Sequence, residues 1–391
     1  MSGRAPAGRS AEHLAQRLVA IRRELHRHPE LAHEEFETTA RIRGWLEAAG
    51  IRIADRYALR TGVIAEVGGR REGPVVALRA DIDALPVQEE TGLPFASEVP
   101  GRMHACGHDF HTAAIIGAAL LLKEREADLS GTVRLIFQPA EEKASGARRV
   151  VASGALDGVS AVFGLHNKPD LPVGAFGIKE GPLMAAADGF RVEVEGRASH
   201  AAVPDAGIDP VVASAYIVTA LQSIVSRSVS PLQSAVISVT QLHGGTAWNI
   251  IPDRAMLEGT IRTFDRSVRS RVRERFEQVV RGTASAFGAR AAIRWIEGPP
   301  PVHNDARLAK LAEAVAAELG LRTVVPVPSA AGEDFAVYQE QVPGLFVFAG
   351  TNGPQEWHHP KFDVDERALA PAAAFFAALA ERALAEARRA S

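Results

Sequence analysis

The stretch TAAIIGAALLLK at Thr112–Lys123 is followed by VRLIF at Val133–Phe137, and this succession decides the fold. The first stretch has the length and apolar content of a buried helix, and the second has those of a buried strand. Strand patterns also precede the helix at Val63–Val67 and Val75–Leu78, and another follows at Val159–Leu165. Buried strands that alternate with helices predict an α/β fold, with a sheet covered by helices on both faces.

Helical patterns lie on both sides of this alternating segment. From Ala11 to Ala49, apolar residues recur at helical spacing, and the pattern is interrupted at His28-Pro29-Glu30, which predicts two helices. Helix, strand and helix patterns resume from Ala306 to the end of the chain. The final segment therefore completes the first domain after an interruption.

The interruption has a pattern of its own. Its predicted elements are a strand at Phe190–Glu195, a helix at Asp209–Ser226, strands at Ala235–Leu242 and Ala255–Thr263, a helix at Ser267–Phe287 and a strand at Ala291–Trp295. This βαββαβ order is typical of a ferredoxin-like module. We expect a discontinuous domain at residues 11–184 and 299–391, an inserted α+β domain at 185–298, and a flexible tail at 1–10.

Composition narrows the classes of partner. The 391 residues are 47% hydrophobic and 23% charged, with a formal net charge of -3 and no basic face or polybasic stretch, so neither nucleic acid nor a membrane is the expected partner. A small molecule is the expected one. The polar start of the chain lacks the apolar run of a secretory signal, and the single cysteine, Cys106, cannot form an internal disulfide. Both observations favour a cytoplasmic location.

Polar residues gather where predicted strands end, which is where open α/β sheets bind ligands. Leu78–Pro86 runs from a strand into Asp81 and Asp83, and Met103–His111 holds a thiol, three imidazoles and a carboxylate in one short loop before a helix. Thiolate and imidazole are good ligands for borderline-soft divalent metals, and a thiolate can bridge two ions. A lone buried cysteine is more often inert packing, but the density of this loop favours a metal site.

Three more strand ends carry candidate groups. Strand patterns run into Glu141 and Glu142, into His166, and, near the end of the chain, into the pair His358 and His359. Because neighbouring side chains of an extended chain point in different directions, one glutamate can face a metal while the other faces a substrate. Single histidines at such places are usually satisfied core groups, but their recurrence at strand ends favours ligands.

Taken in order, these segments resemble the M20 metallopeptidase group, in its amidohydrolase branch of hippurate hydrolases, auxin-conjugate hydrolases and N-acetyl-diaminopimelate deacetylases. The resemblance runs from Arg22 to about Glu366. Its segments are 25–30, 79–86, 104–111, 138–142, 165–167, 200–204, 244–252, 259–265, 333–335 and 358–362. Arg79 departs from other branches, which carry a histidine at that position, and agrees with the amidohydrolase branch.

The resemblance implies a metal-dependent amidohydrolase that cleaves N-acyl amino acids, hippurate-like or N-acetylated. It implies two divalent ions (Zn, Mn, Co or Ni), with Cys106 as the bridge and Glu141 as the general base. Asp81 is expected to orient a histidine ligand. The implied ligands are Cys106, His108, Glu142, His166 and His358, with His359 as the alternative to the last.

The inserted domain is implied to act as a lid and to form a homodimer. His200 is similar to the family residue that stabilises the oxyanion, and Asn249 and Arg262 lie in family-like segments suited to bind the substrate carboxylate. Gly181–Ala186 and Gly298–Pro301 are the expected hinges. Three other readings remain open: a metallo-dipeptidase or carboxypeptidase, a non-catalytic metal or thiol sensor, and a structural metal site.

Overall fold

The computed structural model describes residues 7–68 and 73–390, which form two compact units. The first unit comprises the chain up to Gly181, then His303–Val327 and Val337 onward. The second comprises Pro182–Val302 and Pro328–Ala336. Of the predicted tail at 1–10, residues 1–6 lie outside the described residues, and Ala7–Ser10 belong to the first helix.

The segment Pro328–Ala336 differs from the sequence-based assignment, which placed everything after residue 299 in the first domain. Backbone hydrogen bonds attach it to the second unit. The amide of Ala185 donates to the carbonyls of Ser329 and Ala331 at 3.0 and 3.1 Å, and the amide of Ser329 donates to Leu183 at 2.9 Å. Main-chain pairing of this kind leaves no side-chain pattern, so the sequence carried no sign of it.

A mixed sheet forms the middle of the first unit, as predicted. In the described residues its order is β1-β2-β4-β3-β5-β16-β6-β15, and β4, β3, β5 and β16 run parallel at its centre. Nearly every residue of these central strands is buried, which explains their continuous apolar runs. The strands are β1 (Arg52–Ile53), β2 (Val63–Gly68), β3 (Val75–Asp81), β4 (Thr132–Gln138), β5 (Val159–Lys168), β6 (Ala175–Gly177), β15 (Arg322–Val324) and β16 (Gly344–Gly350).

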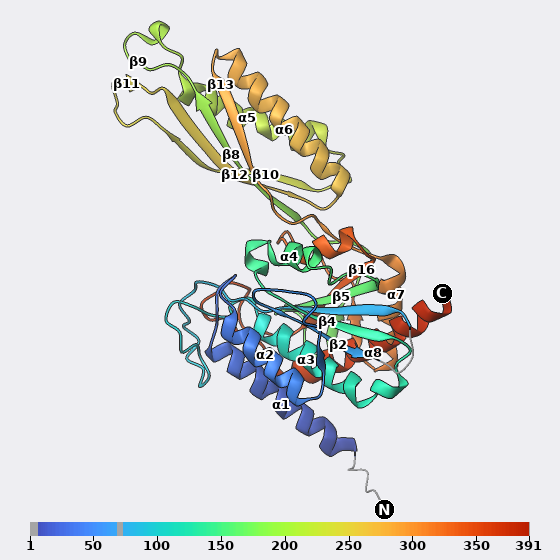
Figure 1. Cartoon of the computed structure of the whole chain (residues 1–391). Helices are drawn as coiled ribbons and strands as arrows, with labels where there is room; N and C mark the ends of the chain where they lie inside the picture. The colour runs from blue at the N-terminus through green and yellow to red at the C-terminus, as the bar shows by residue number, and fades with distance from the viewer. Residues whose placement is uncertain (1–6, 69–72, 391) are drawn as a thin grey trace, which may run out of the picture. The chain divides into compact units, whose positions relative to one another are not determined.

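Helices cover this sheet. The helices α1, α3 and α8 contact one another, and α3 and α8 also contact β3. Figure 1 draws α4 on the other side of the sheet from α1 and α3. The helices are α1 (Ala7–Arg27), α2 (Phe36–Ala48), α3 (His108–Glu124), α4 (Gly146–Ala152), α7 (Ala306–Glu318) and α8 (Leu369–Ala390).

The start of α3 corrects the sequence-based boundary. The helix was predicted from Thr112, with His108–His111 in the preceding loop, but it begins at His108. Gly107 makes the turn into it with φ 85°, a conformation that favours glycine, and a Cβ there would lie 2.3 Å from the side-chain nitrogen Nδ2 of Asn167. Cys106 is therefore in the loop, whereas His108 and His111 are fixed in the first helical turn.

The second unit has the predicted βαββαβ order. Its sheet has the order β10-β12-β8-β13, with all neighbours antiparallel, and α5 and α6 contact each other and this sheet. Its core includes Phe190, Leu257 and Phe276, separate from the core of the first unit. Its elements are β8 (Ala186–Glu195), β9 (Ser199–His200), α5 (Pro210–Ser228), β10 (Ala235–Gly244), β11 (Ile250–Ile251), β12 (Arg254–Thr263), α6 (Arg266–Ala286) and β13 (Arg290–Ile296), while β7 (Gly181–Met184) and β14 (Val302–Asn304) lie where the chain passes between units.

Candidate functional site

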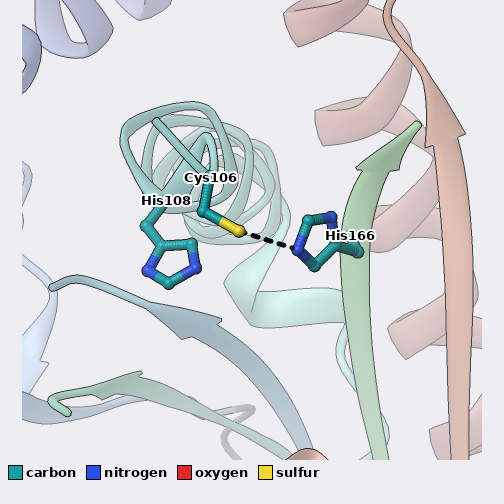
Figure 2. A group of neighbouring side chains, drawn as sticks. All are labelled: Cys106, His108 and His166. Carbon is teal, nitrogen blue, oxygen red and sulfur yellow. Dashed lines mark hydrogen bonds between the residues drawn. The ribbon is translucent and has the colours of Figure 1, made fainter. Parts of the chain in front are cut away.

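The parallel strands bring their carboxyl ends to one edge of the sheet. Asp81 at the end of β3 stands opposite Gln138 at the end of β4, and β5 contributes His166. The loop before α3 supplies Cys106 at the same place, because its Sγ lies 3.4 Å from His166 Nε2. Figure 2 shows the Cys106 side chain between the rings of His108 and His166.

Cys106 belongs to two groups of potential metal ligands. In one, the ligand atoms of Cys106, His108 and His166 lie within 4.8 Å of one another, and in the other those of Cys106, Glu142 and His358 do. A third group joins His108 with Glu141 and Glu142. A sulfur atom shared by two sets of ligands is the arrangement that a bridging thiolate requires.

A hydrogen bond orients His166, and a carboxylate lies behind the ring of His108. His166 Nδ1 donates to the carbonyl of Asn167 at 2.9 Å, which leaves the Nε2 lone pair facing Cys106. His108 Nδ1 lies 3.3 Å from Asp83 Oδ1, and its Nε2 lies on the side of Glu142. An acceptor behind one ring nitrogen, with the other nitrogen free, is typical of metal-binding histidines.

The two histidines near the end of the chain, His358 and His359, have different surroundings. His358 adopts φ 66° and donates its amide to the carbonyl of Ala105 at 2.7 Å, which brings its Nε2 to 3.5 Å from Glu142 Oε1. His359 instead accepts the amide of Lys361 at 3.0 Å. His358, and not His359, lies in the group of potential ligands.

Burial and charge perturb the titration of these groups. Burial raises the pKa of the Cys106 thiol well above its ordinary value, and the charges of Glu142, Glu141 and Asp81 add to this effect. Burial alone would lower the pKa of His108, but the carboxylates of Asp81 and Asp83 outweigh it and raise that pKa to about 10. Without a metal, the site at neutral pH therefore holds a neutral thiol and an imidazolium.

The donor set fits divalent ions. Among the residues that the structure describes, His108 Nε2 and Glu142 Oε1 are buried without a hydrogen-bond partner, which costs free energy unless another group satisfies them. Burial alone would raise the pKa of Glu142, yet His358 and His108 lower it, so its carboxylate is anionic. Thiolate, imidazole and carboxylate together suit zinc and other first-row metals.

Asp81 binds His111, a histidine outside the five ligands that the family resemblance implies, although Asp81, His108 and His111 also form a group that could hold a metal. Its Oδ1 accepts from His111 Nδ1 at 2.6 Å and its Oδ2 from Arg79 at 2.7 Å, while His108 Nε2 is 3.7 Å away. His111 Nε2 accepts the amide of Asn167 at 2.8 Å, so both ring nitrogens are engaged. Although His111 lies near Asp81 and His108, it is occupied in holding the end of β5 against the start of α3.

Sequence reasoning did not assign a role to Asp83. Its two oxygens accept the backbone amides of Glu141 and Glu142 at 3.0 and 3.1 Å, and it also contacts His108. The signal was present, because residues two apart on an extended chain face the same side and Asp83 follows Asp81 by two. Glu141 and Glu142 were identified, but the group that holds their backbone was not.

The three remaining candidates belong to the second unit. His200 on β9 is exposed, accepts the amide of Ala202 at 3.1 Å, and stands opposite Ile250 of β11. Asn249 immediately precedes β11, and its carbonyl accepts the amide of Ala201 at 3.0 Å. His200 and Asn249 are therefore neighbours.

Arg262 lies apart from these two residues. It stands opposite Ala187 near the end of β12, where its guanidinium donates to the carbonyl of Ala330 at 3.5 Å, and partial burial lowers its pKa. The β9–β11 ribbon adjoins the other end of β12, at Arg254, and Figure 1 shows the ribbon at the far end of this unit. At about 3.3 Å per residue, the eight steps along β12 separate the two ends by about 25 Å. The second unit does not bring Arg262 together with His200 and Asn249.

Comparisons with known proteins agree with this architecture. Residues 77–382 match the sequence pattern of peptidase family M20/M25/M40. An N-acetylcysteine deacetylase of Bacillus subtilis is 56% identical over 364 residues, covering 93% of this chain and 96% of that protein. An IAA-amino acid hydrolase of Arabidopsis thaliana, ILR1-like 4, is 41% identical over 94% of this chain and 86% of its own.

A solved structure extends the likeness to the fold. The YXEP protein of Bacillus subtilis, described as a dinuclear metal-binding peptidase of the M20 family, is 52% identical, with a TM-score of 0.88 over 96% of this chain and 99% of that one. Sequence pattern, relatives and fold thus agree, and the chain belongs to peptidase family M20/M25/M40, in whose amidohydrolase branch it is a metal-dependent hydrolase of amide bonds.

Proposed function

We propose that the protein hydrolyses the amide bond of N-acyl amino acids, with small N-acetyl or aroyl groups as the acyl part. The observation that carries the proposal is the position of Cys106 in two ligand groups, with Glu141 beside Glu142. The names of the relatives supply the substrate class, since one is an N-acetylcysteine deacetylase and another an IAA-amino acid hydrolase.

In this proposal two divalent ions bind at the edge of the sheet. Cys106 would be their shared ligand, and His108, Glu142, His166 and His358 would be the others. The ions, when bound, lower the pKa of a water molecule and polarise the scissile carbonyl. The metal is zinc, manganese, cobalt or nickel, since thiolate, imidazole and carboxylate suit each of these.

Glu141 is the proposed general base. Its carboxylate takes the proton of the attacking water and then delivers that proton to the leaving nitrogen, which would otherwise depart as an unstable amide anion. Asp81 has a supporting role. It holds His111, which in turn accepts the amide of Asn167 and so keeps the neighbouring His166 in position.

The second unit is proposed to hold the substrate. An N–H of His200 donates to the oxyanion, and Asn249 and Arg262 bind the carboxylate of the amino acid part. Closure of the second unit over the first, with Gly181–Ala186 and Gly298–Pro301 as hinges, would exclude water from the site.

We also propose a homodimer formed through the second unit. A small substrate cannot span the roughly 25 Å between the two ends of β12, so a second copy would have to supply His200 and Asn249. Within the described residues β10 pairs with β12 alone, and Val236 and Leu242 on it are 49% and 42% exposed. Tyr216, on the largely apolar helix α5, is 57% exposed. An apolar strand edge beside an apolar helix face suits self-association.

The test of the function is amino-acid release from N-acetyl, N-benzoyl and indole-acetyl amino acids and from dipeptides. Chelated protein and metal-restored protein are compared side by side. Metal-dependent release from the acyl amino acids supports the proposal. Cleavage of dipeptides alone would show that the protein is a dipeptidase instead. Full activity of the chelated protein would contradict the metal mechanism.

Glu141→Gln tests the general base. The variant should retain both metals and lose about 10²–10⁴-fold in kcat, the usual contribution of a positioned acid or base. Glu47→Gln, at an exposed glutamate paired with Arg43, is the matched control and should turn over normally. Turnover retained by Glu141→Gln would remove this residue from the mechanism.

A further inference from the structure

The short turn that carries Glu141 and Glu142 presents three consecutive amides to buried carboxylates. Ala140 adopts φ 53° and ψ 42°, and the one-turn helix Glu141–Lys143 follows it without a side-chain cap of its own. Backbone N–H groups next to a left-handed residue converge into a concave anion site, and the first amides of a helical turn need acceptors from elsewhere. Two remote carboxylates supply them.

Asp83 and Glu35 are these two carboxylates. Glu35 Oε1 accepts the amide of Ala140 at 2.8 Å, and the Asp83 oxygens accept the amides of Glu141 and Glu142. Both side chains are buried, with Glu35 0% and Asp83 1% exposed. Neither has an arginine or lysine partner among the described residues. Burying such groups is costly, and their hydrogen bonds to the turn offset part of that cost.

The turn has little freedom to move on its other side. Gly146 packs so closely on it that a Cβ there would lie 1.5 Å from the carbonyl of Pro139. The amide of Gly146 donates to the carbonyl of Ala140 at 3.2 Å. The conformation of residues 139–142 is therefore determined by contacts with other elements.

We propose that Asp83 and Glu35 are positioning residues, which hold the backbone of Ala140–Glu142 so that Glu141 faces the substrate and Glu142 faces the metals. This inference rests on the proposed roles of Glu141 and Glu142. Asp83 also contacts His108 at 3.3 Å, so one carboxylate sets the position of the base and of a ligand on another element. Proton transfer tolerates little displacement, so loosening the turn lowers kcat more than it changes KM.

The variants differ in how many acceptors they keep. Asp83→Asn keeps one acceptor for two amides. Glu35→Gln keeps the single acceptor that Ala140 needs, whereas Glu35→Met removes it. Glu30→Gln is the matched control, because Glu30 accepts the amides of Glu37 and Thr38 at 3.2 and 2.7 Å in the same way but at the start of α2.

The first readout is amide hydrogen exchange in the metal-free protein, which needs neither activity nor metal. In the parent protein the amides of residues 140–142 should exchange slowly. Asp83→Asn should lose protection at Glu141 or Glu142 and keep it at Ala140, and Glu35→Met should show the reverse. Fast exchange in the parent protein, or no change in Asp83→Asn, would overturn the inference.

The second readout is steady-state kinetics of the metal-loaded protein. Asp83→Asn and Glu35→Met should lose about 10–100-fold in kcat with KM little changed, the range seen when groups behind metal ligands are removed. Glu35→Gln and the control Glu30→Gln should both keep the kcat of the parent protein. Full turnover in variants that have lost protection overturns the inference. If the parent protein cleaves no acyl amino acid, the proposed function fails, and the exchange pattern still decides whether the carboxylates hold the turn.

Discussion

At the scale of single residues, protonation opposes metal binding. His108 is held as an imidazolium by Asp81 and Asp83, with a pKa raised to about 10, and burial keeps the Cys106 thiol protonated. Metals bind neutral imidazole and thiolate, so both protons must leave before these residues can act as ligands. The same carboxylates that orient His108 thus make its proton harder to remove.

Metal loading of the chelated protein should therefore release about two protons per chain at neutral pH. Both pKa values are raised, so each group is mostly protonated at any pH below its pKa. Because metal binding must displace each of these protons, the apparent metal affinity falls about tenfold per proton for every unit by which the pH is lowered. Calorimetric titration with zinc in buffers of different ionisation enthalpy measures the number. Release of no protons would mean that the site is already deprotonated when empty.

Some residues of the candidate site could be predicted from the sequence, and others could not. Cys106, His108, Glu142 and His166 could be proposed from the sequence because each sits at or near the end of a strand or the start of a helix, where side chains alone mark the site. The position of Asp83 beside Asp81 was a signal, but its task was not, and Glu35 left no signal at all, since the partners of both are backbone amides, which every residue except proline has. The choice between His358 and His359 needed the backbone conformation, which a doublet does not reveal.

At the scale of elements, α1 is tied to the site by one buried arginine. Arg22 is fully buried and binds Asp109 in the first turn of α3 at 2.8 Å, Asp363 at 2.8 Å and Glu366 at 3.3 Å. Asp109 follows His108, and Asp363 lies five residues after His358. The guanidinium thus joins the segments that carry two proposed ligands.

Arg22→Met should destabilise the first unit by about 3–5 kcal/mol, because it leaves Asp109 buried without its main cation. Arg23→Met is the matched control. The Arg23 side chain is 42% exposed and pairs with Glu366, so its loss should cost at most about 1 kcal/mol. Urea unfolding of both variants measures the difference in the free energy of unfolding. Equal midpoints would show that the buried Arg22 contributes no more to stability than the exposed Arg23.

The helices and strands could be predicted from the sequence where apolar residues recur at regular spacing. The strands β3, β4 and β5 and the βαββαβ order of the second unit were predicted because apolar residues recur with the period of each element. The start of α3 was placed too late, since polar side chains at His108–His111 disguise a buried helical turn. Arg79 and Asp81 satisfy each other inside the protein, so a charged pair could end a fully buried strand.

At the scale of the whole molecule, the distance along β12 predicts cooperation between copies. Glu141→Gln lacks the proposed base and His200→Ala lacks the proposed oxyanion donor, so the proposed homodimer of either variant alone should be nearly inactive. If His200 serves the partner's substrate, mixed dimers contain one intact site, and random pairing would restore about a quarter of parent activity. Co-expression with two different affinity tags isolates the mixed dimers, which have one intact site of two and should show about half of parent activity. No recovery in them would show that His200 serves its own chain or no substrate.

The discontinuous first unit has a consequence for synthesis on the ribosome. The second unit is nearly contiguous, from Pro182 to Val302, and its core residues lie between Phe190 and Ala291, so it can form its core once this stretch has emerged. The first unit must wait longer, since β16 pairs beside β5 and α8 packs on α3. The proposed ligand His358 also emerges late. A nascent chain therefore exposes the apolar face of α3 until α8 has emerged, and stalling before α8 would leave an incomplete, aggregation-prone unit for chaperones to bind.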